Sequence, residues 1–189
     1  LRQRWPQAGS VTVLAGSGNN AGDGYLVAAL AQRAGWQVQV FAVVAPNALR
    51  DTAAEAYAEA VAAGVVVQPW QNSVPLHGVL VDALLGTGLT GVVREPFAAA
   101  IAQINASGLP VLALDLPSGL CADTGAELGQ AVQAELTVTF IALKLGLLTG
   151  AGPDRGGALQ LDELRADGQS RASVPATAQR LAAANLPRL

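Results

Sequence analysis

Short apolar runs rich in Val, Leu and Ile alternate along the chain with longer segments whose apolar residues recur at helical spacing. A short apolar run bounded by Gly, Pro or Asn is typical of a buried strand. The pattern predicts strands over residues 11–15, 38–44, 65–67, 78–85, 110–114, 136–141 and 158–161. It predicts helices over residues 25–34, 51–63 and 95–106, each followed by a glycine that suits a helix end: Gly35, Gly64 and Gly108.

The regular alternation of these strands and helices decides the fold class. Consecutive strands joined by helices pair in parallel through right-handed crossovers, which place helices on both faces of one sheet. We therefore predict an α/β protein, a three-layer α/β/α sandwich around a mostly parallel sheet. Its ligand site is expected just outside the carboxyl ends of the strands.

Composition narrows the class of partner. The 189 residues are 51% hydrophobic and 13% charged, which excludes a disordered chain. The net charge is -3 and the 11 Lys and Arg residues are scattered, so we expect a small-molecule partner and neither nucleic acid nor a membrane. The lone Cys121 forms no internal disulfide, and the single His77 precedes its strand, away from the expected site.

The first strand is followed by Gly16-Ser17-Gly18-Asn19-Asn20-Ala21, which fits the phosphate-binding pattern G-x-G-x-x-A. A dinucleotide site usually adds an acidic residue after the second strand, and residues 38–47 contain none. That absence argues against a nicotinamide dehydrogenase or a methyltransferase. The loop also contains a polar insert, Asn19, Asn20 and Asp23. The alternative interpretation is that these side chains only cap a helix that begins near Asp23.

Three later segments at strand ends carry charged side chains. Asp82 lies inside an apolar strand and needs a cation, a Lys or several backbone amides as its partner. Asp115 follows another strand and is the candidate general acid/base, while Ser118 could share a cation with Asp82 or only shape the turn. Lys144 could bind phosphate, tune Asp115 or extend to the surface.

Taken together, residues 19–24, 82–88, 115–119 and 139–146 resemble the YjeF N-terminal domain, the NAD(P)H-hydrate epimerase family. The resemblance covers roughly residues 9–165. It implies a Rossmann-like fold, often dimeric, that interconverts the R and S forms of hydrated NADH or NADPH and binds a potassium ion.

The resemblance also implies site residues. Asp115 is the catalytic residue that the family pattern and the strand-end position both indicate. Potassium would be bound by Asn20, Asp82 and Ser118. The residues that would contact the hydrated nucleotide are Asn19, Asn20, Ala21, Gly22, Asp23, Gly86, Thr87, Gly88, Leu89, Thr90, Gly91, Val92 and Asp115. We add Lys144 to this set because it follows the end of a predicted strand.

We expect an epimerase domain over residues 1–166, which lacks the family's N-terminal helical stretch, and a tail or linker over residues 167–189. A hydrate dehydratase is expected to follow in the full-length protein, with a cytoplasmic location and a homodimer. The alternative is a non-catalytic module, because YjeF-like domains also serve as scaffold parts in mRNA-decapping proteins. The presence of Asn20, Asp82 and Asp115 favours the enzyme.

Overall fold

The computed structural model describes residues 1–164 and residue 178, so the predicted tail lies outside the described residues apart from Ala178. Its centre is a seven-stranded sheet in the order β3-β2-β1-β4-β5-β6-β7, and every neighbouring pair is parallel. All seven predicted strands are present: β1 (Ser10–Ala15), β2 (Gln37–Ala42), β3 (Val66–Pro69), β4 (Val79–Ala83), β5 (Val111–Leu114), β6 (Leu136–Phe140) and β7 (Ala158–Asp162).

The direction of strand succession reverses beside β1. The chain first adds β2 and β3 on one side of β1 and then places β4 on its other side. The connections that leave the carboxyl ends of β1 and β4 therefore run to opposite sides of the sheet, which opens a crevice between them.

The helices occur close to their predicted positions. They are α1 (Asn19–Arg33), α2 (Asp51–Ala62), α3 (Phe97–Ala106) and the short α4 (Gly152–Gly156), with 3-10 turns at Pro46–Ala48 and Leu145–Leu147. Gly35, Gly64 and Gly108 follow α1, α2 and α3 with φ of 80°, 83° and 66°. This left-handed conformation confirms them as helix ends. The sequence pattern did not predict α4, a five-residue turn that begins with Gly-Pro.

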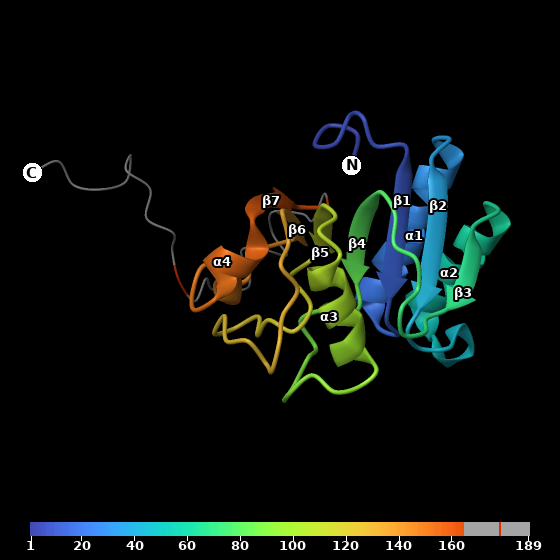
Figure 1. Cartoon of the computed structure of the whole chain (residues 1–189). Coiled ribbons are helices and arrows are strands. Elements are labelled where there is room, and N and C mark those ends of the chain that lie inside the picture. Colours follow the sequence, from blue (N-terminus) through green and yellow to red (C-terminus); the bar gives the residue numbers. More distant parts are fainter. Residues whose placement is uncertain (165–177, 179–189) are drawn as a thin grey trace, which may run out of the picture.

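Alternating strand residues divide the core into two layers. Val11, Val13 and Ala15 pack with α1 and α2, whereas Leu14 and Leu80 pack with α3 on the other face (Figure 1). Both faces of the sheet are thus covered, and this explains why the strands read as nearly continuous apolar runs. The predicted three-layer α/β/α sandwich is confirmed, with a sheet that is parallel throughout its described strands.

Helix α1 begins at Asn19, so the predicted start at residue 25 is wrong. Gly22 and Gly24 are poor helix formers, and local propensity alone places the boundary after them. Tertiary packing prevails, because a Cβ atom at Gly24 would lie 2.4 Å from the Cβ of Ala83, and one at Gly22 would lie 3.1 Å from the Cα of Ala53. The two glycines let the first turns of α1 approach β4 and α2 closely.

This contact makes a prediction for Gly24→Ala. Helix propensity alone would stabilise the variant by about 1 kcal/mol, but the clash with Ala83 reverses the sign and gives a net loss of roughly 1–3 kcal/mol. Urea unfolding measures the difference. Gly9→Ala is the control, because a Cβ there meets nothing within 4 Å. A Gly24→Ala variant at least as stable as the wild type would contradict the packing argument.

Candidate functional site

A cavity of about 830 Å³ lies at the carboxyl ends of the central strands. Its walls come from the start of α1, the turn after β4, and the residues that follow β5 and β6. This is the crevice that the reversal of strand order creates, and its volume is within the usual range for a ligand site.

The start of α1 provides the first wall, through Ser17, Gly18, Asn19 and Asn20. No side chain caps this helix, and its first turn contains no acidic residue. The positive end of the helix dipole therefore lies at the cavity wall, with no side-chain cap from the residues that the structure describes. Such a helix terminus binds an anionic group, a phosphate above all.

The turn after β4 provides the second wall, in which Gly86, Thr87, Gly88, Leu89 and Thr90 all line the cavity. A Cβ atom at Gly86 would lie 3.3 Å from the Cβ of Asn20, so this turn packs against the first turn of α1. Backbone groups of the two walls consequently converge on the same space.

Asp82 is completely buried in β4 and has its partners in the turn after β5. The Ser118 hydroxyl donates to Asp82 Oδ1 at 2.6 Å and the Ser118 amide donates to Oδ2 at 2.8 Å, while the Leu84 amide reaches Oδ1 at 3.2 Å. Burial raises the pKa of Asp82 to about 6, and these hydrogen bonds oppose the rise. Of the partners considered from the sequence, backbone amides hold this carboxylate, and the Ser118 hydroxyl is a further donor that was not considered for it.

Asn20 joins the same cluster through the backbone of Leu85. Asn20 Nδ2 donates to the Leu85 carbonyl at 2.9 Å, and the Leu85 amide donates to Ser118 Oγ at 2.9 Å. The buried Asn20 Oδ1 has no hydrogen-bond partner among the described residues. The structure thus brings Asn20, Asp82 and Ser118 together, with an orphaned oxygen among them. A hard cation prefers such a set of oxygen atoms.

Asp115 lies at the cavity wall directly after β5 and is held by Lys144. Lys144 Nζ donates to Asp115 Oδ1, and Thr139 Oγ1 and the Phe140 amide lie 3.4 Å from the same oxygen. The two charged side chains are only 16% and 18% exposed, so Lys144 does not extend to the surface. Asp115 has φ of 67°, an uncommon backbone conformation for a residue with a side chain, and it lies at a position that lines the cavity.

Asp23 lies one turn along α1 from Asn20 and also lines the cavity. Burial, and to a lesser extent the charge of Asp115, raise the pKa of Asp23 above its usual range. The cavity therefore contains two carboxylates that influence each other.

Four residues assigned to the nucleotide lie outside the cavity lining. Ala21 and Gly22 are buried within α1, and Gly91 and Val92 lie beyond the turn after β4, where Val92 lines a smaller adjoining pocket. His77 is exposed before β4, at the end of the sheet opposite the cavity, as predicted.

Sequence reasoning missed several lining residues: Ser17, Gly18, Leu84, Leu85, Phe140, Ile141 and Leu164. The first two belong to the Gly-rich motif and Ile141 ends a predicted strand, so position at a strand end was a usable signal for them. No sequence signal marked Leu164, which follows the final strand.

Comparison with known proteins identifies the family. Residues 1–146 match the family model described as YjeF-related protein N-terminus. The chain belongs to this family. Curated relatives of this YjeF-related chain include the bifunctional NAD(P)H-hydrate repair enzyme Nnr of Coxiella burnetii, 45% identical over 165 residues that cover 87% of the chain and 34% of that protein.

The Nnr protein of Escherichia coli is 44% identical over 170 residues, which cover 88% of this chain and 32% of that protein. The YjeF-related chain thus spans about a third of the length of these relatives. The crystal structure of yeast ynu0 superposes with a TM-score of 0.61 at 20% identity, over 74% of this chain and 64% of that one, and supports the fold.

The hydrogen bonds of Ser118 predict the effect of Ser118→Ala. The change removes the hydroxyl donor from Asp82 and the acceptor from the Leu85 amide, so it should lower the free energy of unfolding by about 1–3 kcal/mol. Denaturant unfolding measures this loss. Ser17→Ala, at an exposed serine of the same cavity, is the control and should change stability by less than about 0.5 kcal/mol. Equal effects of the two substitutions would show that the Ser118 contacts are dispensable.

Proposed function

We propose that this chain is an NAD(P)H-hydrate epimerase, which interconverts the R and S forms of hydrated NADH and NADPH. One observation carries the proposal: a carboxylate held by Lys144 lines the same cavity as the uncapped start of α1. The helix start suits the nucleotide's phosphates, and Asp115 suits proton transfer at the nicotinamide ring. The names of the Nnr relatives support this substrate, and we assign the epimerase activity to the third of their length that the chain spans.

The chemistry requires proton transfer at one oxygen atom. In the hydrated nucleotide a hydroxyl group is bonded to C6 of the nicotinamide ring. The lone pair of the ring nitrogen expels it, the C6–O bond breaks, and the oxygen takes a proton and leaves as water. Water then adds to either face of C6 and loses a proton to a base. We assign the base role to Asp115, which Lys144 holds in place by a hydrogen bond to Oδ1.

We propose that Asn20, Asp82 and Ser118 bind a potassium ion. The fit rests on the orphaned Asn20 Oδ1 of a residue that Leu85 and Ser118 link to the fully buried carboxylate of Asp82. Within residues 1–164 and 178, no cluster of three or more His, Cys, Asp or Glu side chains could hold a metal. A single carboxylate with neutral oxygen atoms suits a weakly charged ion. Bound there, the ion would supply positive charge beside Asp82 and brace the two turns that hold the nucleotide.

A homodimer and a cytoplasmic location remain part of the proposal, as does the absence of nucleic acid from the reaction. The substrate is a small molecule. Among the residues that the structure describes, no helix combines the length and the apolar character that crossing a membrane requires.

Asp115→Asn tests the base. The amide keeps the size of the side chain but cannot accept the proton, so the R-to-S rate constant above the uncatalysed rate should fall by roughly 10²–10⁴-fold. Chiral separation of the two epimers over time measures it. Asp123→Asn, at an exposed aspartate outside the cavity, is the matched control and should leave the rate unchanged. Undiminished turnover by Asp115→Asn would remove Asp115 from the mechanism.

Potassium binding is testable without turnover. Replacing choline chloride by potassium chloride at equal ionic strength should raise the free energy of unfolding, by about 3 kcal/mol once the ion exceeds its Kd a hundredfold. Asn20→Ala should lose this increment, whereas Asn19→Ala, its exposed neighbour, should retain it. An equal response to potassium in the wild type and in Asn20→Ala would show that the ion does not use this site.

A further inference from the structure

Two carboxylates from different elements share the cavity. Asp23 belongs to α1, which follows β1, and Asp115 follows β5, with β4 between these strands in the sheet. Together with Lys144 they are the ionisable side chains among the described residues that line the cavity. The site therefore has three ionisable side chains among which its protons are distributed.

The ammonium group of Lys144 donates all of its hydrogens to acceptors on the Asp115 side of the cavity. Besides Asp115 Oδ1 it donates to Thr139 Oγ1 at 3.0 Å and to the Phe140 carbonyl at 2.8 Å. An ammonium group has three hydrogens, and three acceptors take them. Lys144 thus offers its hydrogens to Asp115 and none to Asp23.

Asp23 has no cation of its own among the described residues. The charged group that acts on its pKa is Asp115, and within residues 1–164 and 178 the Asp23 side chain forms no ion pair or hydrogen bond. Of the strands near α1, only β4 carries an ionisable residue, Asp82, which is bonded to Ser118. The ionisable residues of helix α2 are Asp51, Glu55, Tyr57 and Glu59. Arg33 of α1 pairs with Glu59.

A negative neighbour and partial burial both favour the protonated form of Asp23. Two titratable groups whose surroundings separate their proton affinities are the usual basis for assigning an acid and a base. Here Lys144 bonds to Asp115 alone of the pair, and burial together with the charge of Asp115 raises the pKa of Asp23.

We propose that Asp23 is a second catalytic residue, the general acid that protonates the departing C6 hydroxyl while Asp115 serves as the base. The inference rests on the proposed epimerase function. Protonated Asp23 transfers its proton to the hydroxyl oxygen as the C6–O bond breaks, and water and an Asp23 carboxylate result. The water that adds to C6 gives its proton to Asp115. Exchange with solvent water returns a proton to Asp23 and removes the proton that Asp115 gained, so no oxidant or other reactant is consumed.

Asp23→Asn tests the proposal, with hydrated NADH epimers as substrate and chiral separation as the assay. Loss of the proton donor should lower kcat by roughly 10²–10⁴-fold with a much smaller change in KM. In the wild type, kcat should fall as pH rises through the raised pKa of Asp23, because the acid loses its proton. This alkaline decline should disappear in Asp23→Asn and persist in Asp23→Glu, which keeps a carboxyl group.

The possible outcomes separate this inference from the function on which it rests. If the wild type interconverts the epimers and Asp115→Asn does not, while Asp23→Asn keeps the kcat and pH profile of the wild type, Asp23 is not the acid and the epimerase function stands. If Asp23→Asn raises KM alone, Asp23 only binds the nucleotide and the inference fails. A wild-type chain that binds NADPH in calorimetry without any turnover would instead overturn the proposed function.

Discussion

The buried carboxylate of Asp82 is the constraint on which the cavity depends. A charge with no exposed surface is costly unless its oxygen atoms are bonded, and desolvation raises the pKa of Asp82 to about 6. Ser118 meets this demand with its hydroxyl and its amide, and the same hydroxyl contacts the backbone of Leu85. Asn20 bonds to that backbone from α1. The start of α1 and the turns after β4 and β5 are therefore joined at one point.

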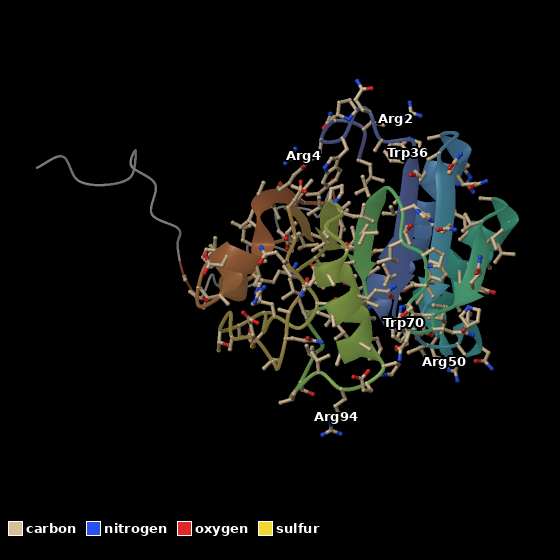
Figure 2. All side chains as sticks on the ribbon, viewed as in Figure 1. Arg2, Arg4, Trp36, Arg50, Trp70 and Arg94 are labelled. Carbon is tan, nitrogen blue, oxygen red and sulfur yellow. The ribbon has the colours of Figure 1, made fainter. Side chains whose placement is uncertain are left out.

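The reactive side chains are placed by this cluster without belonging to it. Asp115 precedes Ser118 by three residues, so the bonds that hold Ser118 against β4 also locate the start of that turn. Asp23 follows Asn20 by three residues on α1, and residues at that spacing share one face of a helix. Asp23 of α1 and Asp115 of the turn after β5 both line the cavity. The cavity lies at the carboxyl-end edge of the sheet, the edge at which Trp70 lies in Figure 2, whereas Trp36 lies at the opposite edge.

Local patterning was sufficient for the strands and insufficient for the site. The seven strands were predictable because residues such as Leu80 and Val81 are buried on opposite faces and leave no polar alternation to confuse the assignment. The start of α1 was not predictable, because the glycine at position 24 of this helix is explained only by its close contact with Ala83. The residue types at Asp82, Asp115 and Lys144 marked the site, but their pairing was open. It depends on long-range geometry, including the left-handed backbone of Asp115, which propensity does not encode.

Charge balance ties the parts of the site together. The start of α1 attracts an anionic nucleotide, yet Asp23, Asp82 and Asp115 would repel it if all three were ionised and unpaired. Lys144 compensates only Asp115, because its hydrogens are already shared among Asp115, Thr139 and Phe140. The remaining two carboxylates need a proton or a bound cation before phosphates can approach closely. A protonated Asp23 and a cation beside Asp82 remove both repulsions, so the same adjustments that admit the nucleotide also equip the site for proton transfer.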